Sequence, residues 1–131
     1  MTTKLELFEI LRVKSIEFQI HEHQPLHTVE DSEKLRGEIS GSHTKNLFLK
    51  NKKNSFFLLS CDEKAKVDLK QFSKSIEGKN LSFAKKEYLD KYLQIKPGSV
   101  SPFALLNDTE NEVKFYLDEK LAKSKLINFH P

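Results

Sequence analysis

Residues 47–59, LFLKNKKNSFFLL, place two apolar runs on either side of a short polar segment. The polar segment Asn51-Lys52-Lys53-Asn54 is typical of a tight turn, because asparagine tolerates turn conformations of the backbone. Two apolar runs joined by such a turn predict a β-hairpin that is buried on both faces for part of its length. We therefore expect this hairpin to form the centre of the fold.

Helices are predicted on both sides of the hairpin. Thr3 and Glu6 have the spacing of a capping box at the start of a first helix. Helical spacing and terminator residues predict further helices over residues 28–36, 68–76 and 85–93. These helices are expected to lie outside the sheet.

Further strands are predicted from alternation and turn residues. Apolar and polar residues alternate over residues 16–20, which indicates a half-buried strand. Residues 103–106 and 113–117 flank the turn-rich segment 107–111 and predict a second hairpin, and residues 126–129 are expected to be extended. The pattern predicts a single mixed α+β domain with hairpins at the centre and helices outside.

Composition places the chain among globular proteins with one modest core. Of its 131 residues, 37% are hydrophobic and 31% are charged, which argues against disorder. No apolar run is long enough to cross a bilayer, and the N-terminal residues do not resemble a signal peptide. One cysteine, Cys61, cannot form an internal disulfide. These features favour a cytoplasmic protein.

Lysines cluster in the central third of a chain whose formal net charge is +3. The clustered residues are Lys45, Lys50, Lys52, Lys53, Lys64 and Lys66. Such a patch attracts phosphates and makes binding depend on salt. A solvated lysine-rich turn explains the same pattern, and charge alone favours that simpler interpretation.

Several catalytic and metal-binding classes are excluded by missing motifs. His21 and His23 lack a third ligand at useful spacing, and neither Cys-x-x-Cys nor His-Glu-x-x-His occurs, so no metal is expected. Cys61 follows an apolar run and is predicted to be a buried structural thiol rather than a nucleophile. No serine-nucleophile, phosphate-loop or dinucleotide motif is present, and no cofactor is expected.

Two polar segments are suited to ligand binding. In residues 41–46, GSHTKN, Lys45 enters a predicted strand and can hold a phosphate or carboxylate as a point charge. In residues 98–102, GSVSP, the glycine allows close approach of a ligand, and the next three amides can converge on an oxyanion. Ordinary loops explain both segments as well, and the residues alone favour that simpler interpretation.

Five segments, taken together, resemble the bacterial prolyl-tRNA editing superfamily, which includes the YbaK proteins and the insertion domain of prolyl-tRNA synthetase. They appear in the family's order and spacing across nearly the whole chain. The segments are Thr28-Val29-Glu30, residues 41–49 (GSHTKNLFL), the loop from Gly98 to Pro102, residues 103–108 (FALLND) and residues 128–131 (NFHP). The forms HTKNLFL and NFHP are most similar to the freestanding alanyl-tRNA(Pro) deacylase branch.

The resemblance implies a single α+β domain with a curved, mixed, mostly antiparallel sheet and flanking helices. It also implies hydrolysis of the ester between alanine and the 3′-terminal adenosine of tRNA(Pro). It implies catalytic roles for Lys45, at the 3′ end of the substrate, and for Gly98, whose loop embraces the aminoacyl carbonyl. The remaining positions implied to bind substrate are Thr44, Asn46, Ser99, Val100, Ser101 and His130. Val29, Val100 and Phe129 are expected to line the pocket and set its size.

In this superfamily no side-chain nucleophile is needed. A vicinal ribose hydroxyl of the substrate helps to activate water, while the protein supplies positioning and electrostatics. The implied partners are tRNA(Pro) mischarged with alanine and, as a docking partner, prolyl-tRNA synthetase. Neither a membrane nor DNA is expected.

Residues 1–131 are expected to form one editing domain that departs from the family after Pro131, where members continue with a strand and a C-terminal helix. Two alternatives stay open at this point. One is a deacylase for cysteinyl-tRNA(Pro) or another small aminoacyl-tRNA. The other is a noncatalytic module that binds tRNA or a synthetase.

Overall fold

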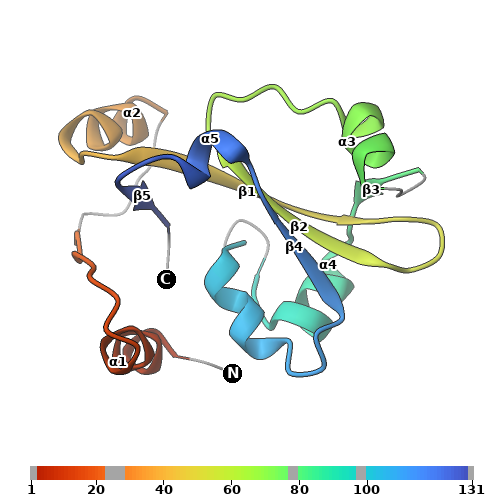
Figure 1. Ribbon diagram of the computed structural model, residues 1–131, viewed down its shortest axis with the longest axis horizontal. Helices are drawn as coiled ribbons and strands as arrows, with labels where there is room; N and C mark the ends of the chain where they lie inside the picture. The colour runs from red at the N-terminus through yellow and green to blue at the C-terminus, as the bar shows by residue number, and fades with distance from the viewer. Residues whose placement is uncertain (1–2, 23–28, 77–79, 97–99, 130–131) are drawn as a thin grey trace.

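The computed structural model describes residues 3–22, 29–76, 80–96 and 100–129. Within these ranges five strands form one open mixed sheet in the order β3-β1-β2-β4, and β5 pairs with β1 beside this path (Figure 1). The strands are β1 (Ser42–Lys50), β2 (Phe56–Asp62), β3 (Ser82–Phe83), β4 (Val113–Leu117) and β5 (Ile127–Asn128). The predicted α+β fold with a mixed sheet and flanking helices is confirmed.

The central hairpin is formed as predicted. Strands β1 and β2 pair antiparallel from Thr44–Asp62 to Lys50–Phe56. In the turn, the Asn51 side-chain oxygen accepts the backbone N–H groups of Lys53 at 3.0 Å and Ser55 at 2.9 Å. Asn51 therefore accepts hydrogen bonds from backbone N–H groups that the pairing of β1 with β2 leaves free, and these bonds stabilise the turn.

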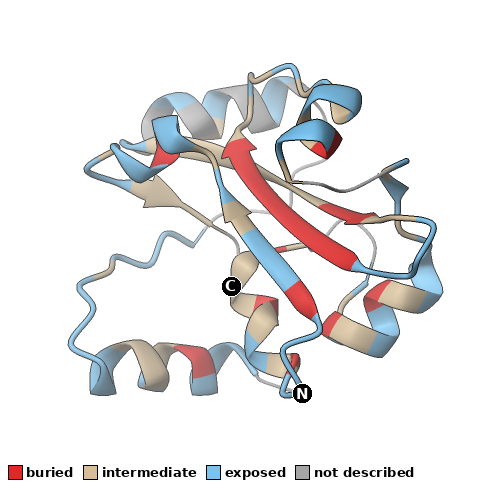
Figure 2. Cartoon of the chain, turned by 45° about the vertical axis from the view of Figure 1, so that its right-hand side comes forward, coloured by how far each residue is buried: buried red, intermediate tan, exposed pale blue. Residues whose placement is uncertain are grey.

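Helices cover both faces of the sheet. On the face that we call the η face, Phe48 and Leu58 pack with residues of the π-helical turn η1 and the 3₁₀ helix η2. On the opposite face, which we call the α3 face, Phe57 contacts Tyr116, and Tyr116 contacts Phe72 of α3. Strand β2 is buried along almost its whole length because it lies between these layers (Figure 2).

Seven helical segments flank the sheet in the described residues; those at 4–13, 29–38, 69–75 and 86–93 lie where helices were predicted, whereas 102–107 was predicted as a strand. They are α1 (Lys4–Val13), α2 (Val29–Glu38), α3 (Leu69–Ser75), α4 (Lys86–Tyr88), η1 (Leu89–Leu93), η2 (Pro102–Asn107) and α5 (Glu119–Ala122). The Thr3 hydroxyl caps α1 by accepting the Glu6 N–H at 3.1 Å. None of the helices in the described ranges has the length and apolar character needed to span a membrane.

The strand predicted over residues 16–20 is not formed. Phe18 instead stacks on Phe8 of α1, with ring centroids 5.8 Å apart. Ile16 and Ile20 are about half exposed. The alternation was misleading because this segment packs on the neighbouring helix, and no strand in the described residues pairs with it.

The predicted second hairpin is also wrong. Ser101 caps the N–H of Phe103, and Pro102 follows at the first position of a helix, so residues 102–107 form η2. Strand β4 then runs parallel to β2, from Phe56–Val113 to Ser60–Leu117. Two parallel strands cannot be joined by a tight turn, and β4 is parallel to its neighbour β2. Because residues 102–107 are helical, the segment between η2 and β4 connects a helix to a strand and is not a hairpin loop.

Candidate active site

Residues 44–46 of β1 carry three of the predicted site side chains, and these do not all share a face. Asn46 lies opposite Ser60 on β2, and the Ser60 hydroxyl donates to the Asn46 side-chain oxygen. Lys45 lies opposite Cys61. Because neighbours along a strand point to opposite faces, Thr44 and Asn46 lie on the η face and Lys45 on the α3 face.

The Lys45 ammonium group is half-buried and donates to the carbonyl oxygen of Ala65, in the loop after β2. The neighbours of Ala65, Lys64 and Lys66, are both exposed. Lys45 therefore contacts the backbone of the segment that carries Lys64 and Lys66. This is one part of the predicted lysine patch.

Cys61 is a buried free thiol on the same face. Burial raises its pKa above the ordinary value of 9.0, since a thiolate is poorly solvated there, while nearby Lys45 partly opposes the shift. Asp118 and Asp62 add to the increase. Cys61 is thus held as a neutral thiol, in agreement with the predicted structural role.

Strand β5 brings the C-terminal segment to the start of β1. It pairs parallel with β1 through Ser42–Ile127 and His43–Asn128. The Thr44 hydroxyl donates to the backbone oxygen of Asn128 at 2.8 Å, and the Asn128 amide donates to the carbonyl oxygens of Ser40 and Ser42. These hydrogen bonds of Asn128 hold the segment that leads to Phe129 against the start of β1. No local pattern in the sequence indicates this role.

Gly41 makes this close pairing possible. Its φ is +105°, and a Cβ at this position would lie 2.8 Å from the Leu126 Cβ and 3.0 Å from the side-chain amide nitrogen of Asn128. A side chain would therefore separate β5 from β1.

Phe129 in turn reaches the start of η2. Its ring lies edge-on to Phe103, with centroids 5.7 Å apart. Ser101, just before η2, is buried, and Val100 packs against the core of the η face. The structure thus brings Thr44 and Phe129 together through Asn128, and brings Phe129 next to the segment that contains Val100 and Ser101.

Four predicted site residues are not tested by these contacts. Gly98, Ser99 and His130 lie outside the described residues. Val29 begins α2, but its side chain is not part of the described structure.

The outer edge of β1 has a gap between its two small neighbours. Strand β5 pairs with Ser42 and His43, whereas β3 pairs with Leu49 and Lys50. Within the described ranges no strand pairs with residues 44–47 on that side. Residues 44–47 therefore lie at an open edge of the sheet, and their side chains on both faces are close to that edge.

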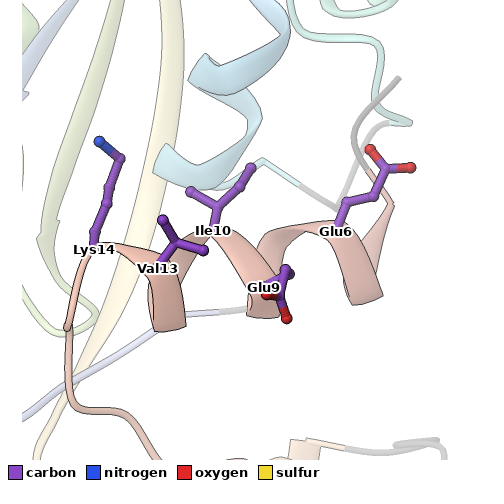
Figure 3. A pocket seen from close by; sticks show the side chains of 5 residues that line it. All are labelled: Glu6, Glu9, Ile10, Val13 and Lys14. Carbon is purple, nitrogen blue, oxygen red and sulfur yellow. The ribbon is translucent and has the colours of Figure 1, made fainter.

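A hollow of about 440 Å³ lies along α1, lined by Glu6, Glu9, Ile10, Val13 and Lys14 (Figure 3). None of these residues was predicted to bind substrate. The hollow is bounded by a single helix and carries no group that is placed for hydrolysis, so it does not define the site.

Comparison with known proteins shows the family to which these segments belong. The model of the aminoacyl-tRNA editing domain matches residues 23–131, which include β1, η2 and β5. The chain belongs to this editing family. The match confirms the resemblance carried by the motifs and the enzyme class that it implies, an aminoacyl-tRNA editing hydrolase.

Two relatives show how far the similarity extends within the editing family. The prolyl-tRNA editing protein ProX of Acetoanaerobium sticklandii is 36% identical over 132 residues, covering 100% of this chain and 80% of the relative. The prolyl-tRNA synthetase associated domain-containing protein 1 of Danio rerio is 35% identical over 125 residues, covering 95% of this chain and 68% of the relative.

Solved structures share the fold. A crystal structure of a hypothetical protein superposes with a TM-score of 0.68 at 14% identity, covering 88% of this chain and 74% of that chain. A candidate trans-editing enzyme for prolyl tRNA synthetase superposes with a TM-score of 0.55 at 23% identity, covering 72% of this chain and 56% of that chain. At these identities the likeness shows the fold alone.

Proposed function

We propose that this chain edits prolyl-tRNA in trans by hydrolysing alanine from mischarged tRNA(Pro). The observation that carries the proposal is the family match across β1, η2 and β5, supported by a relative named as a prolyl-tRNA editing protein that aligns with the whole chain. Thr44, Lys45 and Asn46 lie in the part of β1 that has no partner strand on its outer edge, and Phe129 directly follows β5.

In this proposal the two faces of β1 have different tasks. Thr44 and Asn46, with Phe129 nearby, contact the aminoacyl-adenosine on the η face. Lys45 lies on the α3 face, and its long side chain exchanges the Ala65 carbonyl for a phosphate oxygen of the substrate's 3′ end. A phosphate competes well for an ammonium group, because a charged acceptor forms the stronger hydrogen bond.

The reaction is attack of water on the ester carbonyl. The C–O bond to the ribose breaks, alanine leaves as the free acid, and the ribose oxygen takes a proton. The vicinal ribose hydroxyl helps to orient and deprotonate the water, and the amides of the loop from Gly98 stabilise the developing oxyanion. Cys61 is not the nucleophile, because burial keeps its thiol neutral.

Selection against proline follows from size. A synthetase pocket built for proline cannot strongly reject the smaller alanine, since each missing methylene changes binding by only about 1–3 kcal/mol. A second site that admits alanine and excludes the proline ring corrects the error. Val29, Val100 and Phe129 are the proposed walls of that site. Docking on prolyl-tRNA synthetase stays a prediction from the resemblance.

The test is hydrolysis of alanyl, cysteinyl, seryl and prolyl esters, each on the same tRNA(Pro). Alanine is expected to be released fastest and proline to be retained. Replacement Lys45→Ala is expected to lower kcat/KM for alanyl-tRNA(Pro) by about 100-fold or more, as for loss of one transition-state contact. Lys120→Ala removes the same charge from an exposed lysine of α5 that has no predicted role in the site, and serves as the control.

Each outcome of this panel decides one part of the proposal. Faster release of cysteine than of alanine would transfer the specificity to cysteinyl-tRNA(Pro). Binding of tRNA without cleavage of any ester would make the chain a noncatalytic module. Full activity of Lys45→Ala would remove this lysine from the mechanism.

A further inference from the structure

Two segments at one end of the molecule together carry more positive charge than the whole chain. The β1–β2 turn, β3 and α4 lie together at this end, on the right of Figure 1. Residues 50–56 and 82–93 contain six lysines and two acidic residues, a net charge of +4, whereas the whole chain carries +3. We call the six lysines the basic end: Lys50, Lys52, Lys53, Lys85, Lys86 and Lys91.

Aromatic rings hold two of these lysines in place. The Lys50 ammonium lies 5.8 Å from the centroid of Tyr88, and that of Lys91 lies 5.2 Å from the centroid of Tyr92. Both tyrosine rings pack on Phe56, with centroids 5.0 and 4.3 Å away. The hairpin and the α4–η1 segment therefore form one rigid support, and the charges are partly ordered before any ligand binds.

The predicted lysine patch is thus divided between two places. Lys45, Lys64 and Lys66 belong to the candidate active site, while Lys50, Lys52 and Lys53 belong to the basic end. Lys45 and Lys50 are five residues apart on one strand, which corresponds to about 17 Å. A ligand group held at Lys45 therefore does not reach the basic end, and any one polymer that occupies both must be extended.

Glu87 and Asp90 are the two acidic residues that lie among the six lysines, and the exposed Glu110 and Glu112 precede Val113, which pairs with Phe56 at the same end of the sheet. Phe83 on β3 is 62% exposed and adds an apolar ring to the same end. Repeated positive charges beside an exposed aromatic ring match the chemistry of a nucleic-acid backbone, which offers phosphates at regular intervals.

We propose that the basic end binds the phosphate backbone of the substrate tRNA, inward from the esterified 3′-adenosine that occupies the candidate active site. The identity of the RNA rests on the proposed function. Charge complementarity selects this partner, because the six lysines gather around the end of β1 at Lys50, about 17 Å along the strand from Lys45. In this arrangement the tRNA is held at two places, and the chemistry takes place at only one of them.

The test measures binding of fluorescently labelled, uncharged tRNA(Pro) over a range of salt concentrations. The variant Lys52→Ala/Lys53→Ala removes two exposed charges from the turn, and Lys86→Ala/Lys91→Ala removes two from the other side of the basic end. The control Lys120→Ala/Lys123→Ala removes two exposed charges from α5. Thermal unfolding of each variant confirms that it is folded.

Two lost phosphate contacts reduce the slope of log affinity against log salt by about 1.4 to 1.8. Raising the salt concentration from about 50 to about 200 mM is therefore expected to weaken binding about 7- to 12-fold less in either basic-end variant than in the parent chain. The control variant is expected to keep nearly the salt dependence of the parent chain. Equal effects in all three variants would mean that only net charge matters, and would overturn the proposal. Unchanged binding in both basic-end variants would overturn it as well.

Two further measurements separate the possible failures. Hydrolysis of 3′-alanyl-adenosine, which lacks a tRNA body, is expected to be unaffected by the basic-end variants, because that substrate does not reach the basic end. If no ester is cleaved but the lysine-dependent binding of tRNA persists, the proposed function fails and the binding surface stands. Lysine-dependent binding to phosphatidylserine vesicles with none to tRNA would assign the surface to membranes instead.

Discussion

Replacement Gly41→Ala tests whether the pairing of β5 with β1 depends on the absence of a side chain. Gly41 has a φ of +105°, a region that costs a residue with a Cβ about 1–3 kcal/mol. The new methyl group would also meet the Leu126 Cβ at 2.8 Å and the Leu126 backbone oxygen at 3.1 Å. Neither atom is the free end of a flexible side chain, so the backbone of residues 126–128 must shift.

Strain and overpacking together are expected to lower the free energy of unfolding by about 2–4 kcal/mol. For a domain of this size, that corresponds to a decrease in Tm of about 8–16 °C. The shift also breaks the hydrogen bond from Thr44 to the Asn128 backbone oxygen, so deacylation is expected to fall at temperatures where the variant is still folded.

The matched control is Gly37→Ala. Gly37 lies inside α2, and a Cβ there would have no heavy atom within 4 Å. Alanine is favoured over glycine in a helix, so this variant is expected to be more stable by about 0.5–1 kcal/mol. Thermal and urea unfolding of both variants give the comparison. If Gly41→Ala unfolds within about 0.5 kcal/mol of the parent chain, the tight pairing of β5 is not what stabilises this region.

Three further results are expected from single sites. The Asp108 carboxylate is buried and accepts the N–H groups of Glu112 at 3.1 Å and Val113 at 2.8 Å, so Asp108→Ala should cost about 2–3 kcal/mol in urea unfolding; a loss below about 0.5 kcal/mol would contradict this. The pKa of Cys61 is raised in the folded state, so the folded chain binds more protons than the unfolded chain above the unfolded pKa. Stability should therefore decrease as pH rises from about 9 upward, and Cys61→Ala should remove that part of the decrease, whereas an unchanged pH profile would show that the thiol is not the cause. A double-mutant cycle of Phe103→Leu and Phe129→Leu should give a coupling of about 0.5–1.5 kcal/mol, and strict additivity would show that the two rings do not interact.

The amino-acid sequence by itself determined those features that depend on neighbours in the chain. The β1–β2 hairpin followed from two apolar runs and an asparagine turn, and the start of α1 followed from Thr3. The family also followed from the sequence, since five segments at fixed spacing are a strong signal even when each segment alone has an ordinary explanation. Local hydrogen bonds and side-chain periodicity act over a few residues, so a linear pattern records them.

Only the tertiary structure decided which distant segments pair and which face each site residue occupies. The turn-rich segment after η2 had the composition of a hairpin loop, but β4 pairs parallel with β2, and nothing in residues 107–117 specifies that partner. The sequence predicted a strand core at residues 47–49, whereas β1 begins at Ser42, so the alternation that separates Lys45 from Thr44 and Asn46 was not visible. The role of Asn128 depends on Gly41 and Thr44, more than 80 residues away. The physical reason is that pairing between remote strands is set by competition among all available edges and faces, which no single segment contains.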